Sequence, residues 1–112
     1  MKEYLFLFRG GGNGGIQFAP EQMQQWVEWI AEMQQRGQLI HAQPLDNTGK
    51  HIWRSGKILN ERPFNQEDRS VEGFLVCHAD NYETATEIAM GCPVLQFEDG
   101  NVEIREVQEI KL

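Results

Sequence analysis

Two short segments of this chain, Tyr4–Phe8 and Phe74–Cys77, are apolar at every position. Successive side chains of a strand point to opposite faces of its sheet, so an unbroken apolar run predicts a strand with no solvated side. Two helices can cover only one face of a small sheet. The pattern therefore predicts that the other face is covered by a partner, most simply a second copy of the subunit.

An amphipathic helix is predicted after the first apolar strand. Pro20 suits the first helical position, and Gly37 suits a left-handed cap at the end. Five apolar residues recur at helical spacing and predict one buried stripe: Met23, Trp26, Val27, Ile30 and Met33. Trp29 lies at the edge of this stripe, where we expect it to meet a partner subunit.

The remaining elements alternate between strands and one more helix. A strand over 38–45 is expected to form a hairpin with a strand over 51–59, through the turn residues at 46–49. The second helix is predicted to begin with Asp80 as its cap, because Glu83 follows at the spacing of a capping box.

Strands over 71–79 and 102–110 flank that helix and complete the order of elements. The prediction is a single α+β domain, residues 1–112, with a ferredoxin-like βαββαβ fold and an extra hairpin strand. In this topology both helices cover one face of an antiparallel sheet. The two unbroken apolar strands occupy its centre.

Composition limits the classes of partner. With 112 residues the chain has room for one modest core, and 40% hydrophobic with 24% charged residues is typical of a globular domain. A formal net charge of -7 argues against nucleic acid and against anionic membrane surfaces. The start, Met1–Tyr4, leads directly into a strand and has no signal-peptide pattern, so a cytoplasmic location is expected.

The sequence contains no motif that is typical of a metal site or a cofactor site. Cys77 and Cys92 are far from any metal-binding spacing, and both are interpreted as reduced packing residues. The glycine run 10–15 matches the spacing G-x-G-x-x-G. In a dinucleotide site the helix begins directly at the glycines, whereas here four residues separate the run from the helix. A surface loop, or a flap with Arg9 at its base, is the better interpretation. We therefore predict no metal and no cofactor.

Histidines are the candidate acid–base residues. His41 and His78 lie on predicted strands, and either could face a cavity or a dimer interface; a structural, hydrogen-bonded role is the simpler alternative. His51 lies on the polar hairpin, where a structural role is more strongly favoured. Asp80 beside His78 resembles a dyad, but its capping role is the better explanation.

A candidate ligand pocket combines charged, imidazole and aromatic side chains from separate elements: Arg9, His41, Trp26, Trp53 and Phe64. In this hypothesis Arg9 holds an anionic group and the aromatic residues form apolar walls. For Trp26, packing in the core is the alternative, because the helical stripe needs an apolar residue at that position.

Three segments together resemble a known family: Glu61–Phe64, Val71–Phe74 and Glu87–Pro93. In their order, with the aromatic first strand and the Trp-bearing helix, the chain resembles YCII-related proteins of the DGPF-domain type. The resemblance covers nearly the whole chain. It implies a small bacterial protein with the ferredoxin-like fold of the dimeric α/β-barrel superfamily, and hence a homodimer.

The chain departs from the family pattern in two places. The defining tetrapeptide reads Glu-Arg-Pro-Phe here, so Glu61 and Arg62 replace its Asp and Gly. Some YCII-type proteins are thought to use a His and Asp pair with the His on the first helix, and residues 21–35 contain neither. That catalytic pair is therefore not transferred to this chain.

Three functions remain open at this point. The first is a homodimeric small-molecule-binding or accessory regulatory module. The second is a cofactor-independent enzyme of the isomerase, lyase or oxygenase type, with Arg9 as anion anchor and His41 or His78 as acid or base. The third is a structural or protein-interaction subunit that needs no pocket.

Overall fold

The computed structural model describes residues 2–10, 20–46, 48–52, 54, 56, 58–59 and 71–110. Its elements, in chain order, are β1 (Lys2–Arg9), α1 (Pro20–Gln35), β2 (Leu39–Pro44), β3 (His51–Ile52), β4 (Ile58–Leu59), β5 (Val71–Ala79), α2 (Tyr82–Ala89), the 3₁₀ helix η1 (Pro93–Gln96) and β6 (Asn101–Glu106).

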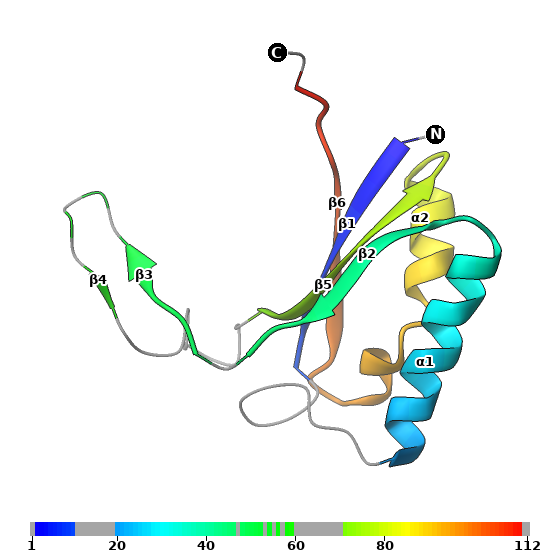
Figure 1. Ribbon diagram of the computed structural model, residues 1–112, viewed down its shortest axis with the longest axis horizontal. Coiled ribbons are helices and arrows are strands. Elements are labelled where there is room, and N and C mark those ends of the chain that lie inside the picture. Colours follow the sequence, from blue (N-terminus) through cyan, green and yellow to red (C-terminus); the bar gives the residue numbers. More distant parts are fainter. Residues whose placement is uncertain are drawn as a thin grey trace.

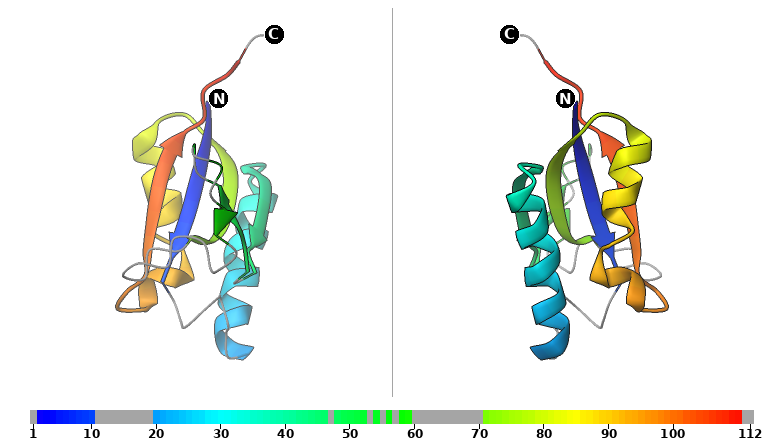
Figure 2. Two further views of the ribbon diagram at one scale, coloured as in Figure 1. Left: turned by 90° about the vertical axis from the view of Figure 1, so that its left-hand side faces the viewer. Right: turned by 90° about the vertical axis from the view of Figure 1, so that its right-hand side faces the viewer.

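Four antiparallel strands form the main sheet in the order β2-β5-β1-β6. Both helices lie on one side of this sheet, α1 toward β2 and α2 toward β6 (Figures 1 and 2). The predicted α+β, ferredoxin-like arrangement is therefore confirmed. So is the central position of the two unbroken apolar strands, β1 and β5.

The hydrophobic core lies between the sheet and the helices. Alternate residues of the two central strands point into it and are buried: Tyr4, Phe6, Phe8, Leu75, Cys77 and Ala79. The helices contribute Trp26, Trp29 and Met33 from α1 and Ala85 and Ala89 from α2. Burial of these side chains supplies the main driving force for folding.

The intervening residues of the central strands point away from the helices. We call this side of the sheet the open face. At its centre lie Leu5 and Leu7 of β1, paired across the strands with Val76 and Phe74 of β5. These four side chains are only half-buried in the single chain, as expected for a surface that its own helices do not reach.

The predicted hairpin between 38–45 and 51–59 is wrong. Strand β2 pairs with β5, while β3 and β4 pair only with each other. Gly56 has a φ of 83° within the turn between β3 and β4, so the chain reverses inside the segment predicted as one strand. The β3–β4 ribbon projects from the open-face side of the sheet (Figures 1 and 2).

The boundaries of α2 and β6 also differ from the prediction. Asn81, not Asp80, caps α2: its side-chain oxygen accepts a hydrogen bond from Thr84 N at 2.8 Å. The 3₁₀ helix η1 has no counterpart among the predicted elements. Strand β6 ends at Glu106, opposite Tyr4 of β1, and one further bond, from Val107 N to Glu3 O, closes the ladder.

Both cysteines are packing residues, as predicted. Cys77 and Cys92 are free and buried. Burial raises the pKa of Cys77 to about 11 and that of Cys92 to about 12. Both thiols are therefore protonated near neutral pH and are poor nucleophiles.

Candidate functional site

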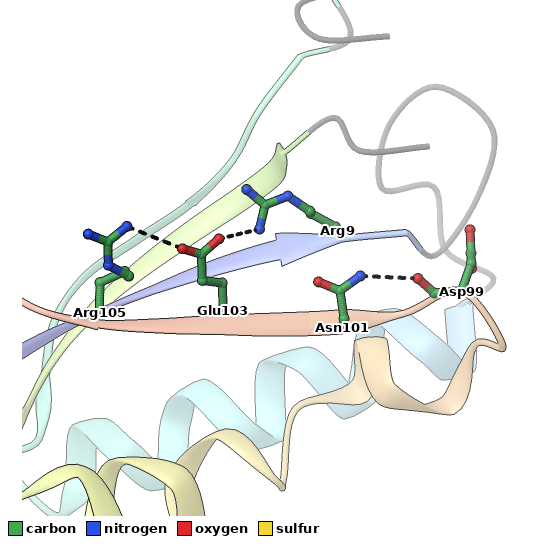
Figure 3. A network of polar contacts seen from close by, with 5 residues as sticks. All are labelled: Arg9, Asp99, Asn101, Glu103 and Arg105. Carbon is green, nitrogen blue, oxygen red and sulfur yellow. Dashed lines mark hydrogen bonds and ion pairs between the residues drawn. The ribbon is translucent and has the colours of Figure 1, made fainter. Parts of the chain in front are cut away.

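Arg9 lies at the end of β1 on the open face and is held by a carboxylate of its own chain. Its Nη1 atom donates to Glu103 Oε1 at 2.8 Å, and Arg105 Nη1 lies 3.3 Å from Glu103 Oε2 (Figure 3). The hydrogen bond from Arg9, followed by that from Arg105, holds the pKa of Glu103 below its usual range. The predicted anion anchor thus takes part in an ion-pair network across β1 and β6.

Replacing Arg9 with glutamine is expected to raise the pKa of Glu103 toward its ordinary value. Because the pKa of Glu103 is lower in the folded protein than in the unfolded chain, its pairing with Arg9 stabilises the fold at pH values above the pKa of Glu in the unfolded chain. This contribution to stability is lost as the pH falls through the lowered pKa of the folded state. An NMR pH titration of the Glu103 carboxyl measures the change. Arg36→Gln is the control, since Arg36 pairs with Glu32 and should leave Glu103 unaffected.

The two candidate histidines also lie on the open face, but far from Arg9. His78 is paired with Glu3, six residues before Arg9 on β1, which is about 20 Å at ~3.3 Å per residue. Its Nδ1 atom is buried and has no hydrogen-bond partner among the described residues. His41 is opposite Val76 on the edge strand β2. The structure therefore does not bring either imidazole together with Arg9.

His41 contacts an aromatic ring instead. Its ring centroid lies 5.7 Å from that of Phe74, with the two planes tilted by 44°. The imidazole is exposed at the margin of the open face. His51 is in the short strand β3 of the projecting ribbon, away from both other histidines along the chain.

Trp26 lies on the opposite side of the sheet from Arg9 and His41. It is buried, and its ring centroid is 5.3 Å from that of Phe8, which also faces the helices. This position agrees with the packing role considered for Trp26. The other two residues of the proposed pocket, Trp53 and Phe64, lie outside the described residues, as do positions 11–15 of the glycine run.

Trp29 is not available to a partner subunit, so that expectation is wrong. The side chain is buried between the two helices, and its Nε1 atom donates to Ile88 O of α2 at 3.1 Å. Its ring also lies 5.7 Å from that of Trp26. Trp29 therefore joins α1 to α2 inside the core.

The structure contains a groove that the sequence did not single out. It lies between α1 and the edge strand β2 and has a volume of about 330 Å³. Its lining comes from four elements: Phe8, Met23, Trp26, Val27, Ile30, Ala31, Gln34, Ala42, Gln43, Pro44, Phe74 and Leu75. We call it the α1–β2 groove.

The apolar stripe of α1 is the sequence signal for this groove, although the stripe by itself predicts only a buried helix face. Met23 and Val27 of that stripe remain 49% and 52% exposed, whereas Trp26 and Met33 are buried. The sheet ends at β2, so the outer part of the stripe extends past its edge. Stripe width is visible in a sequence, but the position of the sheet edge is not.

Comparison with known proteins assigns the chain to a family. The model of the YCII-related domain matches residues 13–111. The chain belongs to the YCII-related family. This confirms the resemblance found in the sequence. No curated protein matches the chain.

Within this YCII-related domain, the described ranges contain no helix long and apolar enough to cross a membrane. The same ranges contain no group of three or more His, Cys, Asp or Glu side chains that could hold a metal ion. The α1 helix of this family member carries no His or Asp, so the proposed His–Asp pair of other YCII-type proteins has no counterpart on it.

Proposed function

We propose that this YCII-related protein is a homodimeric small-molecule-binding module, formed by one domain over residues 1–112. The observation that carries the proposal is the open face. Its central side chains, Leu5, Leu7, Phe74 and Val76, form a continuous apolar surface across β1 and β5 that the two helices leave uncovered. Apolar surface of this kind favours association with a partner.

A second copy fits this surface because both partners in a two-fold pair present the same patch. The apolar centre would pack against itself. The margins are polar, with Glu103 and Arg105 on β6 and His41 and Gln43 on β2. An apolar centre with a polar rim is the usual anatomy of a specific interface.

Replacing Leu7 with lysine is expected to convert the dimer into a monomer. Each dimer would then bury two ammonium groups at the centre of the interface, where the carboxylate opposite position 7, that of Glu103, is already paired with Arg9 and Arg105. This burial should raise the dissociation constant roughly a hundredfold or more. Sedimentation velocity at low micromolar concentration measures the change.

Met90→Lys is the matched control for Leu7→Lys. Met90 is 72% exposed at the end of α2, on the helix side, so its replacement should leave the association unchanged. A wild-type protein that sediments as a single chain at every concentration would remove the dimer from the proposal.

The α1–β2 groove supports the ligand-binding part of the proposal. Its volume of about 330 Å³ and its mostly apolar lining fall within the range of small-molecule sites. Thermal melting of the dimer against a panel of metabolites tests this part, because a ligand that binds the native state raises the melting temperature. A panel without any shift would count against ligand binding and leave the dimer to be judged by sedimentation.

We place this dimer in the cytoplasm, since both cysteines are reduced thiols inside the core. The alternative of a cofactor-independent enzyme is less well supported by the geometry. It needs Arg9 near an imidazole, whereas Arg9 is paired with Glu103 and lies about 20 Å from His78 along the strands.

A further inference from the structure

The lining of the α1–β2 groove is electrically neutral. None of the twelve described residues that line it is Asp, Glu, Lys, Arg or His, although 24% of the whole chain is charged. A charged ligand in this groove would lose water without gaining a side chain of opposite charge, which is costly. The net charge of -7 adds a general repulsion against anions.

The contrast with a neighbouring groove shows that this neutrality is local. Between α1 and α2 lies a groove of about 220 Å³ whose lining includes Glu32, Arg36 and Glu87. Both grooves share the helix α1, but they lie on different sides of it. On α1 itself, Glu32 lines the groove toward α2 together with Trp29 and Met33, whereas the α1 residues that line the groove toward β2 are uncharged.

The walls of the α1–β2 groove favour a flat ring. Phe8 and Trp26 contribute aromatic surface, and Met23 contributes a flexible thioether. Aromatic rings pack against one another edge to face or offset, and a methionine sulfur adds favourable contacts with a ring. The volume of about 330 Å³ corresponds to roughly ten waters at liquid density, enough for one or two fused rings.

A side-chain amide provides the polar part of the lining. It belongs to Gln34 of α1, since Gln43 of β2, which also borders the groove, has its side chain on the open face beside Phe74. A side-chain amide can donate and accept hydrogen bonds without carrying charge, so it suits a hydroxyl, amine or carbonyl substituent on the ligand. This amide would select among neutral ring compounds according to the substituents that the compounds carry.

We propose that the α1–β2 groove binds a neutral aromatic molecule of one or two fused rings with one or two hydrogen-bonding substituents. This inference rests on the proposed binding function and gives it a place and a ligand class. It moves the binding site from Arg9 and His41 on the open face, which the sequence suggested, to the helix side of the sheet. Of the three residues of that sequence-based pocket that the structure describes, Arg9, His41 and Trp26, only Trp26 lines the groove.

A pair of fluorescent probes tests the proposal on the full chain. N-phenylnaphthylamine is neutral, and anilinonaphthalene sulfonate has the same ring system with an added anionic group. We expect the neutral probe to bind with one molecule per chain and the sulfonate to bind at least tenfold more weakly. Equal affinity for the two probes, or failure of the neutral probe to bind, would overturn the assignment.

Val27→Asp places a carboxylate at the groove and is expected to weaken binding of the neutral probe at least tenfold. Val27 is 52% exposed, so the fold should tolerate the change, and Met23→Asp is a second variant at a position 49% exposed. Met90→Asp is the control, because Met90 does not line the groove, and its affinity should stay within twofold of wild type.

The remaining outcomes separate this inference from the proposed function. A metabolite that raises the melting temperature of wild type and of Val27→Asp equally would show binding elsewhere, which overturns the inference and leaves the binding function standing. Probe binding that Leu7→Lys abolishes and Val27→Asp preserves would place the ligand on the open face and would likewise overturn the inference alone. If neither probe nor metabolite binds, both proposals fail in their ligand part.

Discussion

Replacing Gly100 with alanine is expected to destabilise the protein by about 3 kcal/mol or more. A Cβ atom at this position would collide with the carbonyl oxygen of Val94 and lie 3.2 Å from that of Phe97. Val94 is fully buried in η1, so neither the backbone nor the side chain can move aside without disturbing the core. Urea unfolding of wild type and variant measures the difference.

Gly37→Ala is the control for Gly100→Ala. Gly37 follows α1 with a φ of 69°, and a Cβ atom there would meet nothing within 4 Å. Its cost is only that of placing alanine in the left-handed region, about 1 kcal/mol. If the two variants lost equal stability, close packing between η1 and the start of β6 would not be the cause.

Leu75→Ala is expected to cost about 2–5 kcal/mol of unfolding free energy at every protein concentration. Leu75 is fully buried on the helix side of β5, so the truncation leaves a cavity inside the single chain. Denaturant titrations at several protein concentrations measure this cost. They also show whether it depends on association.

Leu7→Ala is the same chemical change on the other face of the sheet, and it serves as the comparison. In the proposed dimer its cost should be carried by the association, so the loss of stability should change with protein concentration. If Leu7→Ala instead lowered the free energy of unfolding as much as Leu75→Ala does, and by the same amount at every protein concentration, the open face would be covered without a second copy.

The central strands of the sheet could be predicted because the signal is local. Each residue of Tyr4–Phe8 is apolar, and a strand exposes alternate residues to opposite faces, so a central strand that is apolar on both faces follows directly. Which residues face the helices could not be predicted, since both sets are equally apolar. The structure assigns Phe6 to the helices and Leu7 to the open face.

The predictions from sequence were wrong where two local signals competed, or where a distant strand of the fold determined which strands pair. Asp80 and Asn81 are both good caps, and in the structure it is Asn81 whose side chain accepts the hydrogen bond from Thr84 N. The turn residues at 46–49 suggested a hairpin, but β5 pairs with β2 and leaves β3 to pair with β4. Pairing between distant strands overrides a local turn signal.

The candidate site depended on contacts that no local pattern reveals. Arg9 and Glu103 are 94 positions apart, and their ion pair exists because β6 lies beside β1. The α1–β2 groove depends on where the sheet ends relative to α1. Residue types identified the chemistry available, while topology decided which groups meet.

In the proposed dimer, the β3–β4 ribbon, which stands out on the open-face side, would restrict how the two molecules can meet. A bare apolar plane permits many sliding offsets and rotations between two sheets. An obstacle at one end of that plane blocks most of these arrangements, because an incoming molecule collides with the ribbon unless it docks in a permitted orientation. Steric exclusion by the ribbon would thus leave a single docking orientation, although the apolar surface itself does not discriminate between orientations.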